Sequence, residues 1–390
     1  MKQSKTIYLW EYAPSPHLGN VLKGMVKLGY RAQYMVHSKT YAHRQAEGWM
    51  PPEFPGVEVH QLGSVAEVSE VIERSSNEDI HVCVGLRAND YMREVNVALR
   101  TADRRFLLFM ETISERNWLS LVKRLLYRAL FWRNRRWLEG ILATGASTPD
   151  WVAARGQCRA SIFDFCYFLS PQKPKSAPLH TKEVFRLLFV GNLIKRKRVH
   201  LILEALAEMP AHVVLDVVGD GPLRAKLEVF ADAHLPGRVT FHGARPMPEI
   251  TCFMREANCL VLPSDHDGWG AVVSEAMIVG TPVVCSDRCG ASVVVRASGR
   301  GHVFETFTPG ACTEALMAQV TTGASDDAER AALADWATCL TEEDGAAYLD
   351  AIITHLRHGD PRPAPPWKSS GSLRNKQEIT WHDQPAIGLD

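Results

Sequence analysis

The amino-acid sequence predicts an α/β fold made of two doubly wound domains that face each other across a cleft. Three observations support this prediction. The chain has 390 residues, which is enough for two separate hydrophobic cores. Short apolar runs alternate with longer helical patterns, as is typical of the βαβ units that build parallel sheets. Between the two halves, residues 170–178 contain three prolines and no aromatic residue, which predicts a linker over residues 170–183.

Each half of the chain contains six apolar runs with the length of strands. In the first half, residues 1–169, the predicted strands are Thr6–Trp10, Ala32–Val36, Ile80–Val84, Phe106–Met110, Ile141–Thr144 and Ser161–Phe165. In the second half, residues 184–330, they are Phe185–Val190, Val213–Val218, Val239–Phe241, Cys259–Leu262, Pro282–Cys285 and His302–Phe304. Ligands of doubly wound sheets bind beyond the carboxyl ends of the strands, so functional side chains are expected in the loops that follow these strands.

Two further segments complete the chain. Residues 331–358 carry helical patterns and predict terminal helices. Residues 359–390 begin with a cluster of four prolines, and no apolar periodicity follows it. Such a segment has too little apolar surface to form a packed element, so it predicts a flexible tail.

Composition and charge exclude several classes of protein. Apolar residues make up 46% of the chain and charged residues 23%, which is ordinary for a soluble globular protein. The formal net charge is zero, so no global field attracts nucleic acid and no nucleic-acid partner is expected. No apolar run approaches the roughly 18 residues of a membrane-spanning helix. The nine cysteines are scattered singly, which favours a reducing compartment and therefore a cytoplasmic protein.

The most informative segment is 263–276. The predicted strand Cys259–Leu262 leads into a loop with Gly268 and Gly270, and an apolar helix opens at about Ala271. This arrangement points backbone N–H groups at an anion such as a phosphate. Two carboxylates, Asp267 and Glu275, flank the loop. Because carboxylates repel phosphate, they are expected to accept hydrogen bonds from hydroxyls. A ligand with both phosphate and many hydroxyls is a nucleotide sugar.

The same segment resembles the signature of the retaining glycosyltransferases of family 4, which have the GT-B fold of two Rossmann-like domains. Their pattern is Pro-Ser, two residues, Glu-Gly-Phe-Gly, and then Glu-Ala eight positions after the first Glu. Here Asp267 stands for the first Glu and Trp269 for the Phe. The resemblance continues in segments 219–222, 241–243, 280–284 and 290–291. It covers roughly residues 184–295 well and the first half loosely. In this fold a terminal helix often crosses back to the first domain.

The resemblance implies that the second domain binds a nucleotide diphosphate sugar as donor. Lys197 matches a lysine that binds the donor diphosphate. Asn192 occupies the position of the family's arginine, and Arg198 that of a glycine. Asn cannot form the forked, charged hydrogen bonds that arginine makes with phosphate, so Lys195 or Arg196 is expected to substitute. The alternative is a solvated basic turn before a helix.

Other donor contacts are expected on neighbouring loops. By the resemblance, Glu275 accepts hydrogen bonds from the ribose and Asp267 from the hexose hydroxyls. Arg245 either stacks on the base or points to solvent. The full set of predicted donor-binding residues is Gly19, Asn192, Lys197, Gly219, Gly221, Gly243, Arg245, Asp267, Gly268, Trp269, Gly270 and Glu275.

Two loops of the first half are expected to face the same ligand. Residues 14–20 resemble the glycine-bearing loop that closes over the donor in this fold, and they contain His17 and Gly19. His17 either faces the cleft or caps or flanks the following helix. Glu111 follows the strand Phe106–Met110 directly, where acids in the family commonly contact the acceptor or the reacting sugar. The alternative for this residue is a carboxylate at a helix start. Predicted catalytic residues are His17, Glu111, Lys197 and Asp267.

The segment Arg116–Leu138 is strongly basic. It contains seven lysines and arginines and no acidic residue. Its apolar members on one helical stripe are Trp118, Val122, Leu125, Ala129 and Trp132. A basic helix with an apolar face suits an anionic membrane surface. The alternative is a helix packed on its own sheet with a solvated basic back.

Metal binding is not expected. Asp265 and Asp267 have the spacing of a metal-binding pair, but Asp267 already aligns with the hydroxyl-binding acid. The predicted protein is a metal-independent, retaining glycosyltransferase without a cofactor, which moves a hexose to a glycan or lipid-linked glycan in cell-surface polysaccharide assembly. It is expected in the cytoplasm or on the inner face of the cytoplasmic membrane. The alternatives are a GT-B nucleotide-sugar epimerase and a catalytically degenerate partner subunit, because Asn192 and Asp267 depart from the family pattern.

Overall fold

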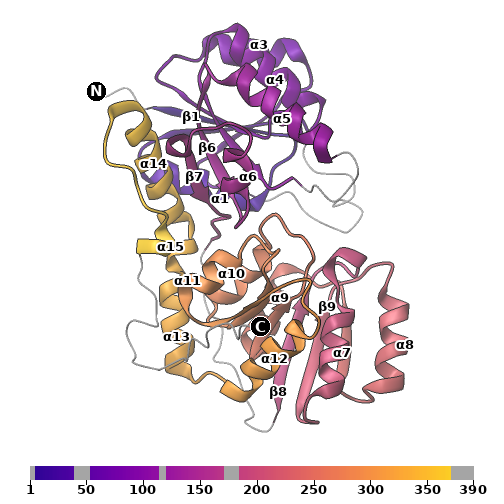
Figure 1. Cartoon of the computed structure of the whole chain (residues 1–390). Helices are drawn as coiled ribbons and strands as arrows, with labels where there is room; N and C mark the ends of the chain where they lie inside the picture. Colours follow the sequence, from indigo (N-terminus) through magenta and orange to yellow (C-terminus); the bar gives the residue numbers. More distant parts are fainter. Residues whose placement is uncertain (1–4, 39–52, 114–119, 171–183, 370–390) are drawn as a thin grey trace, which may run out of the picture.

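The computed structural model describes residues 5–38, 53–113, 120–170 and 184–369. Two parallel sheets with interleaved helices form two domains, one above the other in Figure 1. The predicted linker, residues 170–183, therefore lies outside the described residues, apart from its first position. None of the described helices is long and apolar enough to cross a membrane.

The two sheets have closely related topologies. The first has seven strands in the order β3-β2-β1-β4-β5-β6-β7 and the second has six in the order β10-β9-β8-β11-β12-β13. The strands of the first are β1 Thr6–Glu11, β2 Arg31–Val36, β3 Glu58–Gln61, β4 Ile80–Val84, β5 Phe106–Glu111, β6 Leu138–Thr144 and β7 Ile162–Phe165. Those of the second are β8 Phe185–Val190, β9 Val213–Val218, β10 Val239–Gly243, β11 Cys259–Leu262, β12 Val283–Ser286 and β13 Gly301–Phe304. In both sheets the strand order reverses beside the first strand, which is where doubly wound domains bind ligands.

All twelve predicted strands are present, and the two doubly wound domains are confirmed. The strands are readable because a parallel sheet is covered on both faces, so its strands are continuous apolar runs. The structure adds β3, which the sequence analysis missed. This edge strand is largely exposed and carries only one apolar residue, Val59, so it has no apolar signal.

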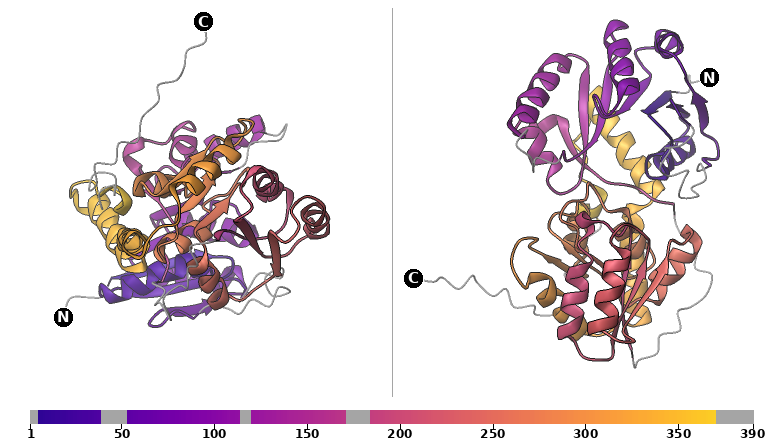
Figure 2. Two further views of the ribbon diagram at one scale, coloured as in Figure 1. Left: turned by 90° about the horizontal axis from the view of Figure 1, so that it is seen from below. Right: turned by 90° about the vertical axis from the view of Figure 1, so that its right-hand side faces the viewer.

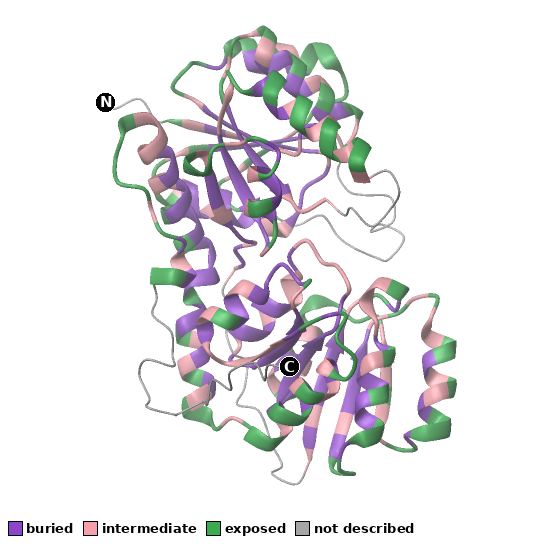
Figure 3. Ribbon diagram, viewed as in Figure 1, coloured by how far each residue is buried: buried purple, intermediate pink, exposed green. Residues whose placement is uncertain are grey.

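Helices connect the strands. The described ones are α1 Pro16–Lys27, α3 Val65–Arg74, α4 Asp90–Thr101, α5 Ser120–Asn134, α6 Thr148–Ala153, α7 His200–Glu208, α8 Arg224–His234, α9 Met247–Glu256, α10 Ala271–Ile278, α11 Ser292–Ser298, α12 Ala311–Thr322, α13 Asp327–Trp336, α14 Glu342–His358 and α15 Pro366–Ser369. Figure 3 shows the buried strands between helices whose outer faces are exposed.

Helix α14 crosses back from the second domain and packs against α1 of the first. In the right-hand view of Figure 2 it lies along the upper domain, with one end near the lower one. The two helices approach closely at Gly24, where a Cβ atom would lie only 2.4 Å from the carbonyl oxygen of Glu342. Further along, the Tyr30 hydroxyl donates to Asp350 at 2.5 Å. The two passages of the chain between the domains are also hydrogen bonded, because Leu169 donates to Leu340 and Glu342 donates to Leu169.

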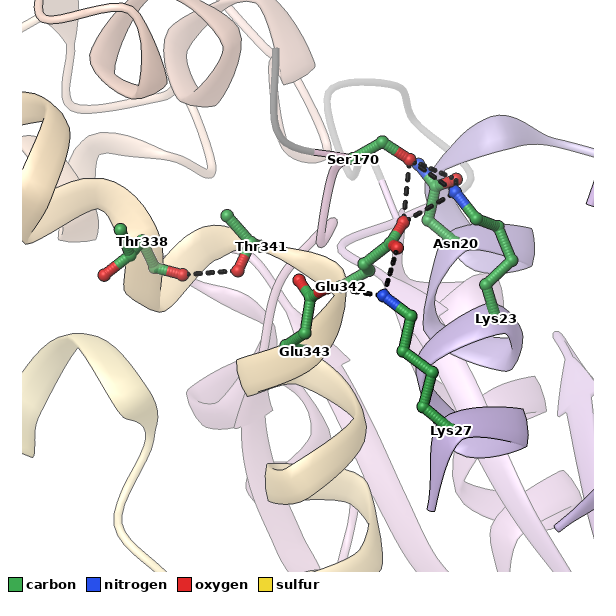
Figure 4. Close-up of polar contacts among 8 residues, drawn as sticks. All are labelled: Asn20, Lys23, Lys27, Ser170, Thr338, Thr341, Glu342 and Glu343. Carbon is green, nitrogen blue, oxygen red and sulfur yellow. Dashed lines mark hydrogen bonds and ion pairs between the residues drawn. The ribbon is translucent and has the colours of Figure 1, made fainter. Parts of the chain in front are cut away.

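A polar cluster, the hinge cluster, stands at the start of α14 (Figure 4). Glu342 is buried and accepts hydrogen bonds from Lys23 at 2.7 Å, Ser170 at 2.7 Å and Lys27 at 3.2 Å. Burial alone would raise the pKa of this carboxyl, but the three donors outweigh burial and hold the pKa below its ordinary value. Lys27 also pairs with Glu343 at 2.5 Å. The cluster ties α14 to the first domain at the point where the chain enters it.

The prediction of a flexible tail from residue 359 is wrong for residues 359–369. Trp367 on α15 is only 3% exposed, and its ring centre lies 6.4 Å from that of Trp269 in the second domain. Lys368 forms an ion pair with Asp164 at 2.9 Å, and Arg362 donates to two backbone carbonyls of the first domain. The proline cluster hid this short element, which is fixed by a single large aromatic side chain. Residues 370–390 lie outside the described part.

Candidate functional site

The glycine loop predicted to bind an anion lies between β11 and α10. Gly270 precedes the first residue of α10 and has a φ angle of +89°, in the left-handed region that favours glycine. A Cβ atom there would also lie 2.8 Å from the Cys289 sulfur. The loop is held against the loop after β12, because Asp267 donates its N–H to Arg288 and Gly290 donates to Asp267. The start of α10 thus has a fixed position with its backbone N–H groups at one end.

Asp267, which was expected to accept hydrogen bonds from sugar hydroxyls, instead pairs with two cations. Arg196 donates to Oδ1 at 2.6 Å and Lys197 to Oδ2 at 2.8 Å. Burial would raise the pKa of the carboxyl, but Lys197 and Arg196 outweigh burial and lower the pKa. We call these three residues the cleft cluster. It contains two positive charges and one negative charge, so one positive charge is left over.

The side chains of the basic turn after β8 have different surroundings. Arg196 reaches Asp267 and the carbonyl of His266, whereas Lys195 is exposed. Of the two expected substitutes for the missing arginine, Arg196 is thus the one that lies at the glycine loop, and Asn192 is exposed. Arg198, at the family's glycine position, has φ +52°, which explains why a glycine suits this position. Its guanidinium donates to the carbonyl of Thr306 at 2.8 Å, so it faces away from Asp267.

The predicted donor-binding glycines at the ends of β9 and β10 lie where the backbone packing requires glycine. Gly219 has φ +138°, and a Cβ atom there would lie 2.0 Å from the carbonyl oxygen of Gly191. Gly221 likewise approaches the backbone of Leu193. Gly219 donates to Gly243 at 2.8 Å. The three loops therefore stack on one another beside the cleft cluster, and glycine is required for this stacking whether or not a nucleotide binds there.

Glu275 lies one turn inside α10. It keeps some exposure, yet the surrounding protein raises the pKa of its carboxyl to about 7, and burial is the only cause. Among the described residues no hydrogen bond or ion pair to this carboxyl is found. A carboxyl in such surroundings gains free energy from hydroxyl donors, which is the property expected of a ribose-binding residue.

Trp269 does not present its side chain as predicted, whereas Arg245 is exposed, as in the second of its two expected arrangements. The Trp269 indole is 1% exposed, packs near Trp367 and donates to Ser274 at 3.0 Å. Its side chain thus belongs to the core beneath the glycine loop, and a direct contact with the donor through the indole is excluded in this conformation. Arg245 donates to the carbonyl of His242 at 3.0 Å and lies 3.5 Å from Glu249.

The first domain contributes Glu111, at the carboxyl end of β5. Its Oε2 atom occupies the space beside Gly268, since a Cβ atom at that glycine would lie 2.1 Å away. Gly268 therefore needs to be glycine because of this close approach. Burial raises the pKa of Glu111, and so does the negative charge of Asp267. The hydrogen bond from Tyr167 and the positive charge of Arg196 lower the pKa, but the net shift is upward.

The two domains meet at backbone atoms near the same place. A Cβ atom at Gly145 would lie 2.4 Å from the carbonyl oxygen of Gly268, and a Cβ atom at Gly290 would lie 1.9 Å from the same oxygen. Ala146 of the first domain donates to the carbonyl of Gly290 at 3.1 Å. These contacts bring the carboxyl ends of β5 and β6 to the glycine loop, so residues from both halves form one site.

Gly19 is not part of this site. It lies in the first turn of α1, buried, and a Cβ atom there would lie 2.2 Å from the ring of Phe54. The predicted loop that closes over the donor is therefore a helix start whose glycine packs against a core ring. His17, two residues earlier, stacks on Tyr167, with ring centres 4.6 Å apart. Tyr167 is a site residue that the sequence analysis missed; its only signal is its place after the end of β7.

Among the described residues no group of three or more histidine, cysteine or acidic side chains is arranged to hold a metal ion. All nine cysteines are free.

The second domain resembles a known family in sequence. Residues 172–331 match the family described as Glycosyl transferases group 1. The matched residues make up less than half of the chain. The glycine loop, the cleft cluster and Glu275 all lie within the matched residues.

Part of the chain is similar in sequence to bacterial glycosyltransferases. The D-inositol 3-phosphate glycosyltransferase of Corynebacterium glutamicum (strain R) is 26% identical over 199 residues, which is 47% of this chain and 47% of the relative. A protein of the same name from Corynebacterium efficiens is 27% identical over 133 residues. The chain thus matches about half, or less, of the length of these relatives.

Solved structures resemble about nine tenths of the chain. The lipopolysaccharide outer core galactosyltransferase WaaB superposes with a TM-score of 0.69 at 16% identity, over 89% of this chain and 99% of that one. Anabaena HepE in complex with UDP and glucose superposes with a TM-score of 0.62 at 19% identity, over 90% of this chain and 100% of that one. The fold is GT-B, as predicted.

Proposed function

We propose that the protein transfers a hexose from a nucleoside diphosphate sugar to a glycan or lipid-linked glycan, with retention of anomeric configuration and without a metal ion. One observation carries the proposal: the cleft cluster brings two cations and one carboxylate to the start of α10, next to Glu111 of the other domain. Such a site suits a diphosphate whose sugar end reaches the first domain. The family match and the UDP complex of HepE support this assignment.

Cleavage of the sugar–phosphate bond adds negative charge to the leaving diphosphate. Lys197, Arg196 and the N-terminal end of α10 are placed to stabilise that charge, which is the role that a metal ion has in other enzymes. Glu275 accepts hydrogen bonds from the ribose. Asp267 already accepts from two cations, so we assign it the positioning of these cations and not attack on the sugar. The acceptor then attacks from the face of the departing diphosphate, which retains the configuration.

The test is a donor screen. UDP-, GDP- and ADP-hexoses are incubated with the dialysed protein in the presence of a strong chelator, with and without glycan and lipid-linked acceptors. Acceptor-dependent release of nucleoside diphosphate supports transfer. Turnover without acceptor indicates an epimerase or hydrolase, and donor binding without turnover a degenerate subunit. If activity disappears with chelator and returns with magnesium or manganese, the metal-independent mechanism is wrong.

The surface of α5 supports a membrane-bound acceptor. Leu121, Val122, Leu125 and Trp132 are large apolar side chains on this helix, and each is more than half exposed. The opposite face of α5 packs on the sheet through Phe131 and its neighbours. The predicted stripe of Val122, Leu125, Ala129 and Trp132 is thus the outward face, while Arg116 and Trp118 lie outside the described residues. Several large apolar side chains exposed together on one face are typical of an interaction surface.

Positive charge surrounds this apolar face. Its exposed arginines are Arg124, Arg128, Arg133, Arg135 and Arg136. Arg135 lies over the Trp132 ring at 4.4 Å, an arrangement that keeps an aromatic side chain and a cation together at the surface. Basic residues near an anionic bilayer contribute about 1 kcal/mol each at best, and exposed aromatics add to them. We therefore propose that α5 binds the anionic surface of the membrane that holds the acceptor.

Vesicle flotation tests this. The protein is expected to float with anionic vesicles at low salt, to detach at 1 M salt, where the Debye length is about 3 Å, and to ignore neutral vesicles. The double variant Arg124→Glu, Arg128→Glu should stay at the bottom of the gradient. The matched control, Arg74→Glu with Arg93→Glu on the exposed faces of α3 and α4, should float like the wild type. Equal loss in both variants would mean that only net charge matters, and α5 would not be the binding surface.

A further inference from the structure

Tyr167 connects three elements of the first domain at the candidate site. It lies two residues after the end of β7, on the segment by which the chain leaves the domain. Its ring is stacked between Phe109 of β5, at 5.9 Å between ring centres, and His17 of α1, at 4.6 Å. Both ring pairs are nearly parallel, with interplanar angles of 13° and 14°. Two flat neighbours fix the plane of the tyrosine ring and hence the direction of its hydroxyl.

That hydroxyl donates to Oε1 of Glu111. The other carboxylate oxygen, Oε2, is the atom nearest to the position that a Cβ of Gly268 would occupy. Both oxygens lie against the glycine loop of the second domain, Oε2 at 2.1 Å and Oε1 at 2.7 Å from that Cβ position, but Oε1 also accepts the hydrogen bond from Tyr167. A carboxylate held by one oxygen in this way presents the second oxygen in a defined direction.

We propose that Tyr167 is a positioning residue that orients Glu111 so that Oε2 accepts a hydrogen bond from a hydroxyl of the acceptor or of the transferred hexose. This inference rests on the proposed function and names a residue that acts through Glu111. The stacked rings of His17 and Phe109 keep the tyrosine in place. His17 then has a supporting role beneath Tyr167, and the hydroxyl-binding atom of the first domain belongs to Glu111.

The ionisation of Glu111 reports on this contact. The groups that influence the carboxyl are Tyr167 in the same domain and Asp267 and Arg196 across the domain interface. The Tyr167 hydrogen bond lowers the pKa of Glu111 against the effect of burial. Tyr167→Phe removes only the hydroxyl and keeps the stacked ring. It is therefore expected to raise the pKa of Glu111, since a hydrogen bond to the charged form is lost.

The experiment compares Tyr167→Phe with Tyr348→Phe. Tyr348 also donates one hydrogen bond to the first domain, but its acceptor is the carbonyl of Asp164, at 3.0 Å, and not Glu111. In Tyr167→Phe the acidic limb of the pH profile of kcat/KM should move to higher pH by about half a unit or more, with kcat reduced about tenfold and the Kd of bare nucleoside diphosphate unchanged. Tyr348→Phe should keep the wild-type profile. An unmoved limb in Tyr167→Phe, or the same shift in both variants, overturns the proposal.

A measurement without turnover separates this proposal from the proposed function. The side-chain carboxyls of glutamate are labelled with carbon-13 and titrated by NMR in the ligand-free protein, and the Glu111 signal is assigned by its absence in Glu111→Gln. A higher pKa in Tyr167→Phe than in the wild type supports the orientation of Glu111 by Tyr167. If the pKa rises but no donor in the screen is bound or consumed, the proposed function fails and the positioning contact stands. If the pKa is unchanged, Tyr167 does not position Glu111.

Discussion

Among the described residues, the hinge cluster and the cleft cluster each hold one largely covered carboxylate between two cations. In the hinge cluster Glu342 accepts from Lys23 and Lys27 (Figure 4). In the cleft cluster Asp267 accepts from Arg196 and Lys197. Both carboxyls have a pKa held below its ordinary value by their partners against the effect of burial. By ion pairing alone the two clusters are equivalent.

Their surroundings distinguish them. The hinge cluster is completed by Glu343, so its two cations meet two carboxylates, and Ser170 donates to Glu342 as well. It joins α1 to α14, and its two positive charges are balanced by two negative charges. The cleft cluster has two cations and one carboxylate, and it stands beside the glycine loop and the start of a helix. The comparison teaches that similar ion pairs can have different surroundings, and we assign the donor to the cluster that has more cations than carboxylates and lies beside a helix N-terminus.

The largest effect is expected for Lys197→Ala. Loss of a cation that stabilises the leaving diphosphate should reduce kcat/KM by about 10²–10³-fold, or about 2.7–4 kcal/mol, as for other charge-stabilising donors. Lys23→Ala, the equivalent change in the hinge cluster, should lower the free energy of unfolding but leave kcat/KM within a few-fold of the wild type. Steady-state kinetics with a saturating acceptor measure kcat/KM of both variants, and a denaturant titration measures the free energy of unfolding. Full activity of the Lys197 variant would remove this residue from the site.

Glu275→Gln sharpens the comparison, because this carboxyl has no cation partner among the described residues. Its pKa is raised to about 7, so its neutral form stabilises the fold below pH 4.5, and that contribution is lost as the pH rises through about 7. The variant should therefore be more stable than the wild type at pH 8, yet bind nucleoside diphosphate more weakly by about 1–3 kcal/mol, since ribose hydroxyls lose a charged acceptor. Thermal unfolding and calorimetry test the pair of effects. A variant that loses stability at pH 8 without losing affinity would assign Glu275 to the fold alone.

Glu342→Gln gives the smallest and purely structural effect. The pKa of Glu342 is below its ordinary 4.5, so its stabilisation is present above pH 4.5 and is lost as the pH falls through the folded-state pKa. The variant should lose about 1–2 kcal/mol of unfolding free energy at pH 7, with no difference from the wild type at low pH. Denaturant titrations at pH 7 and at pH 3 measure this. A comparable loss of donor affinity would show that the two clusters are coupled through the hinge.

The sequence predicted the twelve strands and the glycine loop because each depends on local pattern: buried parallel strands are apolar throughout, and Gly270 is needed for a left-handed φ. Gly268 and Gly19 show the limit of that reasoning. Both are glycine because a side chain distant in the sequence, Glu111 or Phe54, fills the space where a Cβ would be. Such requirements are set by tertiary packing, so the sequence can indicate a special glycine but not its neighbour.

Other features of the site depend on which side chains meet. The family pattern identified Asp267 and Lys197, but it did not show that they pair with each other. The proline-rich end of the described chain predicted a flexible tail, whereas the Trp367 side chain packs near Trp269. Tyr167 has no motif and is recognised only by its contacts with Glu111 and His17. In each case the deciding partner is more than 50 residues away.

The central claim is that the cleft cluster, and not the hinge cluster, holds the donor diphosphate. Calorimetric titration of bare nucleoside diphosphates into the wild type, Lys197→Ala and Lys23→Ala tests it most directly. The account predicts that at least one nucleoside diphosphate binds the wild type and Lys23→Ala with the same Kd, and that Lys197→Ala weakens it by tenfold or more, about 1.4 kcal/mol. Unchanged affinity in Lys197→Ala, or equal losses in both variants, would contradict it.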